Sequence, residues 1–106
     1  MYRIRALPVA RRDLLDAVRR ISRGPGGPEA AGRLVDEFGS AVPSLSSMPH
    51  GRRVYVPLRP LAHDFRALPV GSRLASYWVE EEPERVVTVA RLLFARSDYA
   101  SELGLG

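Results

Sequence analysis

Alternation of apolar and polar residues marks the start of the sequence, and helical spacing marks the segments that follow it. Residues 2–7 (YRIRAL) alternate and predict a short strand, which Pro8 ends because proline cannot donate a ladder hydrogen bond. From residue 9 to residue 23, large apolar side chains recur at intervals of three and four residues, which is the spacing of one helix face. The apolar face of this predicted helix consists of Leu14, Val18 and Ile21, widened by Leu15 and Ala17.

A second helix is predicted after a glycine-rich break at residues 24–27 (GPGG). Pro28 suits the first position of a helix, and Glu29 beside it favours the positive end of the helix dipole. Its apolar face comprises Ala31, Leu34, Val35, Phe38 and Val42. Pro43 ends the helix and residues 44–49 form a loop, so the two segments predict an antiparallel helical hairpin.

Three further strands are predicted, at residues 65–70, 73–80 and 85–94. Gly71 and Ser72 form a tight turn between the first two, and residues 81–84 (EEPE) form the turn between the last two. Residues 53–56 have the composition of a brief strand, but Pro57 and Pro60 exclude a central position for it. The expected fold is α+β: a short N-terminal strand, a two-helix antiparallel hairpin, then a three-stranded antiparallel meander with the helices packed on one face of the sheet.

Length and composition limit the classes of protein that this sequence can specify. With 106 residues and 45% hydrophobic residues, residues 1–106 are expected to form a single domain. The absence of cysteine excludes disulfides, thiolate zinc sites and cysteine nucleophiles. No apolar run approaches the roughly 18 residues of a membrane span, and the N-terminus does not resemble a signal peptide. We therefore expect a cytoplasmic protein without a membrane partner.

All 16 basic residues are arginine, against 12 acidic residues, which gives a net charge of +4. A GC-rich coding bias explains the absence of lysine, because most surface exchanges of arginine for lysine are harmless. The placement of the charges is more informative. Residues 52–79 contain five arginines and only one acidic residue, Asp64, which favours a polyanionic or acidic partner. The acidic cluster of Glu80, Glu81, Glu82 and Glu84 is interpreted as a solvated hairpin tip.

Motifs for metal, cofactor or hydrolase chemistry are not found. His50 and His63 have no ligand partner at zinc-site spacing, so we expect no metal. His63 beside Asp64 suits a general base, but the alternative is an incidental surface pair. The sequence contains no Gly-x-Ser-x-Gly, Walker or Rossmann pattern, so no cofactor is expected.

Arginines on the last three predicted strands are the remaining candidates for function. Arg66, Arg73, Arg91 and Arg96 lie on or at the ends of these strands, with Tyr77, Trp78 and Tyr99 nearby. Guanidinium groups beside aromatic rings suit the binding of phosphates and the stacking of bases on an open sheet face. The alternative is that they are solvated edge charges. Because neighbouring strand residues point to opposite faces, either Tyr77 or Trp78 faces the helices.

Two strand segments resemble the RelE/ParE toxin superfamily. They are residues 65–80 (FRALPVGSRLASYWVE) and residues 86–98 (VVTVARLLFARSD). Members typically carry the strand pair L-R-x-x-P-V-G-x-Y-x-I-x-Y-R-V and a final strand ending in H-G-R-R-D. The short first strand and the helical hairpin agree as well, so the resemblance covers nearly the whole chain in element order and spacing.

The resemblance implies a toxin that a cognate antitoxin neutralises, with either of two targets. RelE-like members are ribosome-dependent mRNA endonucleases that use basic residues and often a C-terminal tyrosine, whereas ParE-like members poison DNA gyrase. Matched position by position, Arg66, Arg73 and Arg96 fall on basic positions of the family, and Tyr99 is a poor match to the tail tyrosine. Ser97 replaces the second basic residue at the end of the last strand, and Leu68 replaces another.

These departures and the long helical hairpin favour a gyrase-directed toxin that cleaves no RNA, because loss of a preorganised cation lowers a rate by orders of magnitude. Two alternatives remain. One is a ribosome-dependent endonuclease that uses Arg66, Arg73, Arg96 and Tyr99, without metal. The other is an inactive relative that acts as an interaction module.

Overall fold

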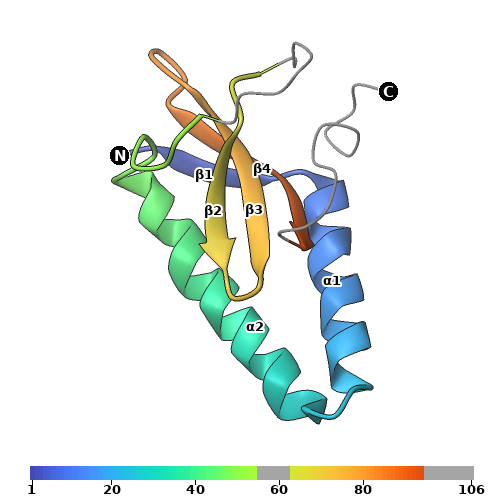
Figure 1. Ribbon diagram of the computed structural model, residues 1–106. Coiled ribbons are helices and arrows are strands. Elements are labelled where there is room, and N and C mark those ends of the chain that lie inside the picture. Colours follow the sequence, from blue (N-terminus) through green and yellow to red (C-terminus); the bar gives the residue numbers. More distant parts are fainter. Residues whose placement is uncertain (55–62, 95–106) are drawn as a thin grey trace.

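The computed structural model describes residues 1–54 and 63–94, and within them an α+β architecture (Figure 1). Two helices follow the first strand, and three further strands follow the helices. The elements are β1 (Arg3–Ala6), α1 (Pro8–Ser22), α2 (Gly27–Ala41), a 3-10 helix η1 (Val42–Ser46), β2 (Arg66–Val70), β3 (Arg73–Glu80) and β4 (Val86–Phe94). The predicted strands and helices are confirmed to within one or two residues at each end.

Residues 42–46 differ from the prediction, because the chain continues from α2 into the 3-10 helix where a loop was expected. Pro43 lacks an N–H but has a backbone angle suited to the first turn of a helix, so it begins η1 instead of ending all helical structure. The Ser44 hydroxyl donates a hydrogen bond to the Ala41 carbonyl oxygen at 2.5 Å and links the two helices.

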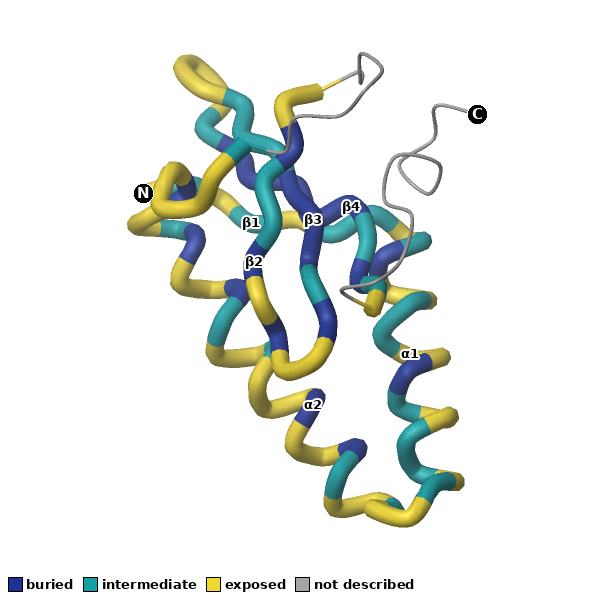
Figure 2. Tube along the Cα trace, viewed as in Figure 1, coloured by how far each residue is buried: buried dark blue, intermediate teal, exposed yellow. Residues whose placement is uncertain are grey.

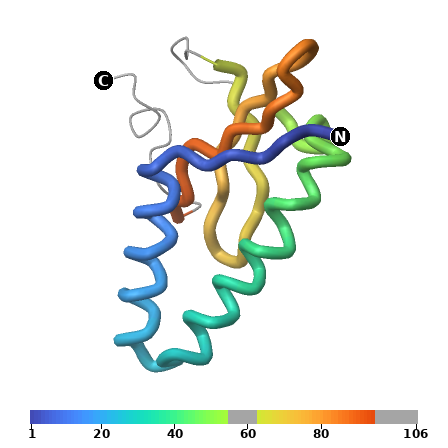
Figure 3. Tube along the Cα trace, turned by 180° about the vertical axis from the view of Figure 1, so that it is seen from behind, coloured from blue at the N-terminus to red at the C-terminus, as the bar shows by residue number. Residues whose placement is uncertain are grey.

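The strands form one sheet in the order β1-β4-β3-β2. The meander β2-β3-β4 is antiparallel, as predicted, and β1 pairs in parallel with β4, so that Arg3 lies opposite Val86 and Ala6 opposite Val89. Residues from the two ends of the described chain therefore lie side by side (Figure 3). Both helices pack on one face of this sheet, α1 against β4 and α2 against β2 (Figure 1).

A β-bulge between β3 and β4 changes which residues of β4 face the helices. Tyr77 lies opposite Val89, whereas Ser76 lies opposite Arg91, so β4 has one extra residue at this point. Before the bulge the odd-numbered Val87 and Val89 face the helices, and after it the even-numbered Leu92 does. A parity rule applied to the whole strand therefore places its second half on the wrong face.

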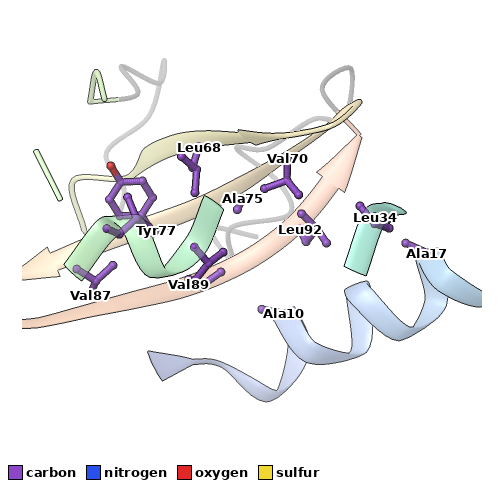
Figure 4. Close-up of a cluster of buried hydrophobic side chains, with 12 residues drawn as sticks. Ala10, Ala17, Leu34, Leu68, Val70, Ala75, Tyr77, Val87, Val89 and Leu92 are labelled. Atoms are coloured by element: carbon purple, nitrogen blue, oxygen red, sulfur yellow. The ribbon is translucent and has the colours of Figure 1, made fainter. Parts of the chain in front are cut away.

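The core lies between the sheet and the helices (Figure 4). Tyr77 is its largest fully buried side chain, and its hydroxyl donates a hydrogen bond of 2.8 Å to the Pro49 carbonyl oxygen. Burial raises the pKa of Tyr77, because the charged phenolate is disfavoured away from water, and the bond to Pro49 satisfies the buried hydroxyl. Figure 2 shows the buried residues gathered in β3 and β4 and on the sheet-facing sides of the helices.

Contrary to the sequence prediction, Leu15 and Val35 lie outside the apolar interface, at 54% and 46% exposure.

Beyond the end of β1, the side chain of Asp13 on α1 provides the hydrogen-bond acceptor for the edge of β4. The last backbone bond of this edge runs from the Leu7 N–H to the Val89 carbonyl oxygen. Further along, the Leu92 N–H donates to Asp13 Oδ2 at 3.0 Å. The Arg91 guanidinium grips the same carboxylate at 2.7 and 3.0 Å, and both side chains are mostly buried. One carboxylate thus joins the first helix to the central strand.

The acidic turn after β3 is tied to neighbouring segments, so it is more than a solvated tip. Glu81 accepts a hydrogen bond of 2.6 Å from the Tyr2 hydroxyl and contacts His50 Nε2 at 2.6 Å. These hydrogen bonds, from Tyr2 first and then His50, lower the pKa of Glu81. Glu82 pairs with Arg85 at 3.2 Å within the turn. Through the two contacts of Glu81, the turn connects to the N-terminal segment and to the segment after η1.

We expect Asp13→Asn to lower the free energy of unfolding by about 2–4 kcal/mol, because it removes the mostly buried carboxylate that binds two nitrogens of Arg91. Urea denaturation followed by circular dichroism measures this change. Asp16→Asn is the matched control, because Asp16 forms only an exposed pair with Arg19 at 3.6 Å. The control should change the free energy of unfolding by less than about 0.5 kcal/mol. Equal effects of the two variants would contradict the role given to Asp13.

We expect the hydrogen bonds of Glu81 to make stability depend on acid pH. Because the folded-state pKa is lowered, the stabilisation is complete above the pKa of the unfolded chain and is lost as the pH falls through the folded pKa. Urea midpoints of the native protein and Glu81→Gln should therefore differ at pH 6 and converge between about pH 5 and pH 3. Glu84→Gln, on the same turn, is the control and should run parallel to the native protein.

Candidate functional site

The structure places Arg66 and Arg73 at opposite ends of the β2-β3 hairpin. Both side chains emerge on the helix-facing side, because Arg66 lies opposite Tyr77 and Arg73 opposite Val70. Along β3 these positions are four residues apart, which corresponds to about 13 Å along a strand. The two arginines are therefore not brought together. Arg96, Ser97 and Tyr99 lie outside the described residues.

Arg66 contacts the segment that precedes β2. Its Nη1 donates a hydrogen bond to the Arg52 carbonyl oxygen, and its backbone forms an isolated bridge with Val54. The guanidinium group thus holds residues 52–54 against the edge of the sheet. The predicted brief strand at residues 53–56 is represented by this bridge at Val54, and its last two residues lie outside the described part of the chain.

Arg73 is 6% exposed and lies on an aromatic ring. Its guanidinium carbon is 3.9 Å from the centroid of the Phe94 ring, which is the geometry of a cation–π interaction. A cavity of about 220 Å³ lies beside this pair, between α1 and the end of β4. The charged residues in its lining are Asp13, Asp16, Arg20 and Arg73. Two carboxylates and two guanidinium groups line it, so the cavity is not a purely cationic phosphate pocket.

A larger hollow of about 460 Å³ lies at the C-terminal half of α1. It is lined by Asp16, Arg19, Arg20, Arg23 and Gly24. The two arms of the hairpin differ in charge, since residues 8–23 contain five arginines and two aspartates, whereas residues 27–41 contain one arginine and three carboxylates. The helical hairpin therefore has a basic first arm and an acidic second arm. This contrast was readable in the sequence once the two helices had been assigned.

The opposite face of the sheet carries an aromatic cluster that the sequence analysis did not find. Trp78 points away from the helices, which resolves the choice left open between it and Tyr77. The His63 ring stacks on the Trp78 ring with centroids 3.9 Å apart and planes 1° apart. Phe65 packs edge-on against both rings. The sequence suggested the pair of His63 and Asp64 as a general base or as an incidental surface pair, and nothing in it pointed to a stack.

Residues 1–54 and 63–94 contain no cluster of three or more metal-ligating side chains. Among the helices of this same part of the chain, none is long and apolar enough to cross a bilayer.

Comparison with known proteins gives matches in structure alone, since neither a family model nor a curated protein sequence matches the chain. A chain of the chromosomal ParDE toxin–antitoxin system of P. aeruginosa superposes with a TM-score of 0.66 at 20% identity, covering 89% of this chain and 96% of that one. A metal-bound toxin from Helicobacter pylori gives 0.55 at 18% identity, covering 90% and 96%. A chain of a RelBE toxin–antitoxin complex from Mycobacterium tuberculosis gives 0.52 at 27% identity, covering 88% and 96%.

These matches extend over nearly the full length of the chain and of each neighbour. The protein therefore has the fold of the RelE/ParE toxin superfamily.

Proposed function

We propose that the protein is the toxin of a type II toxin–antitoxin module, that it inhibits growth, and that a cognate antitoxin neutralises it. The shared fold supports this proposal, because two of the structural neighbours belong to ParDE and RelBE toxin–antitoxin systems. The matches cover almost the whole of each neighbour, so the resemblance extends to a complete toxin chain.

For the target we propose DNA gyrase, with no cleavage of RNA. The observation that carries this choice is the state of the arginines. Arg66 on β2 and Arg73 on β3 are offset by about 13 Å along the hairpin. Arg91 is bound by Asp13 and Arg73 lies on Phe94. Cleavage by attack of a ribose hydroxyl needs cations that are gathered and open around one phosphate, because preorganised charge supplies most of the rate. Ser97 at a position that is usually basic argues in the same direction.

For the antitoxin we propose docking along the helical hairpin. Leu15 on α1 and Val35 on α2 are exposed apolar side chains that a partner can cover. Because α1 is basic and α2 is acidic, an extended partner with one acidic end binds in one direction along the hairpin. An amphipathic antitoxin segment with an acidic portion beside α1 matches this surface. Met48, in the loop after η1, is a large apolar side chain outside both helices and is 69% exposed.

We expect induction of the protein alone to arrest bacterial growth, and co-expression with its antitoxin to restore growth. Purified toxin should then inhibit supercoiling by gyrase, while mRNA on translating ribosomes stays intact by primer extension. Cleavage of mRNA in the ribosomal A site, with supercoiling unchanged, would replace the gyrase proposal by a RelE-type endonuclease. Unaffected growth would instead favour an interaction module without toxicity.

We expect Leu15→Asp and Val35→Asp each to weaken antitoxin binding by at least about tenfold, because a buried, unpaired carboxylate is costly at an interface. Isothermal titration calorimetry measures the dissociation constant, and thermal unfolding verifies the fold. Met48→Asp introduces the same charge at an exposed apolar residue outside the helices and should leave the affinity unchanged. A similar loss for all three variants would overturn the assignment of this surface.

A further inference from the structure

We propose that the sheet face opposite the helices carries a nucleobase-stacking subsite on Trp78, that Arg5 is its phosphate contact, and that His63 fills it in the free protein. The ligand class is single-stranded nucleic acid. The inference does not depend on the identity of the toxin's target, because it concerns direct binding by the purified chain.

The first observation is the way in which Trp78 is covered. His63 lies parallel to the indole at the 3.9 Å separation of stacked planar rings, and His63 itself is exposed. Phe65, which is 4% exposed, contacts the indole edge-on with centroids 5.6 Å apart and fixes its orientation. The indole nitrogen has no hydrogen-bond partner within the described chain, so packing holds this ring in place. An exposed planar heterocycle thus already occupies a rigid aromatic platform.

The second observation is a row of side chains across three strands. Arg5 lies opposite Thr88, and Thr88 lies opposite Trp78, so all three project from the same face. With strands about 4.8 Å apart, the Arg5 and Trp78 backbones are separated by about 10 Å, which suits a base on one side chain and its phosphate on the other. Arg5 Nε donates to the buried Thr88 hydroxyl at 2.7 Å, which orients the guanidinium group.

Arg5 also retains capacity for an anion. Its side chain is 56% exposed, and its one ion pair among the described residues is a long contact of 3.7 Å to Glu80. Exposed pairs at such distances contribute little, so a phosphate oxygen can displace this carboxylate. Arg3 is exposed on the same strand two residues away and therefore on the same face, which extends the positive charge along β1. Glu80 is the competing anion at this site.

This arrangement selects single strands over duplexes. A base in a duplex is stacked on its neighbours and cannot lie on a protein ring unless it is extruded, whereas an unpaired base can replace His63 on the indole. Stacking on an aromatic side chain is tolerant of sequence, and arginine supplies the backbone contact. RNA and DNA both meet these requirements, so both are tested.

Trp78 is the single tryptophan of the chain, so its fluorescence reports the site directly. Titration with decamers of riboadenylate or deoxyadenylate should quench the emission in a saturable manner. A decamer of the same backbone without bases, and an adenine–thymine duplex, should produce little quenching. The absence of saturable quenching with both single strands, or equal quenching by the base-free strand, overturns the proposal.

Variants separate the individual contributions, and circular dichroism establishes that each is folded. Arg5→Ala should weaken binding about tenfold and lower the slope of log affinity against log salt by about 0.7, the value for one phosphate contact on a single strand. Arg33→Ala is the control, because it removes the same charge from the exposed side of α2. If Arg33→Ala weakens binding as much as Arg5→Ala, the attraction is only general, and the proposal fails.

The two side chains that compete with the ligand give the opposite result. His63→Ala should tighten binding by about twofold to fivefold with no change in salt slope, because it removes the ring that the base displaces. Glu80→Gln should also tighten binding, because it removes the carboxylate that competes for Arg5. Weaker binding by His63→Ala shows that the imidazole itself holds the ligand and overturns its role as the displaced group. Growth arrest and gyrase inhibition test the proposed function separately from these binding measurements.

Discussion

The sheet is held together by β4, and the hydrogen bonds along the outer edge of β4 are completed by two different groups. Along its first half, the backbone of β1 provides that edge; along its second half, the carboxylate of Asp13 does. The replacement is economical in chain length, because one helical side chain satisfies a strand N–H and at the same time binds Arg91. The β-bulge at Ser76 and Tyr77 lies next to this transition and turns Leu92 toward the helices, where it joins the core. The position of α1 is thereby coupled to the register of the central strands.

The same interactions explain why several arginines of the sheet are not free to act as cations. Arg91 stabilises the contact between helix and strand, Arg73 covers Phe94, and Arg66 holds the segment before β2. Arg66 lies at the opposite end of the β2-β3 hairpin from Arg73, whereas Arg73 lines the same cavity as Asp13, the partner of Arg91. Most of the exposed arginines in the described residues lie on α1 and β1, and Arg33, Arg52 and Arg53 are exposed as well. The exposed positive charge of the described residues is therefore not gathered at one place on the β2-β3 hairpin.

The order and bounds of the elements followed from the sequence, because apolar periodicity, Pro8, the 24–27 break and the Gly71 turn are local signals. Gly71 illustrates this well: its φ of +60° requires glycine, and a Cβ there would lie 2.5 Å from the Glu37 carboxylate. The parallel pairing of β1, the bulge in β4 and the stack of His63 on Trp78 were not predicted, because each depends on residues that are distant in sequence. At Leu68, the sequence indicated only that a basic residue of the family is replaced, whereas the structure shows a core residue at 4% exposure.

The pairing of residues 3–6 with residues 86–89 also determines when the fold can form during synthesis. The first strand leaves the ribosome more than eighty residues before its partner, and the core between α1 and β4 cannot close in the interval. A chain with such distant contacts folds late and slowly, because loop closure must be completed before the contacts stabilise it. The nascent chain therefore lacks the toxin fold for most of its translation. The cell that makes it encounters the folded form only once nearly all of these residues have been synthesised.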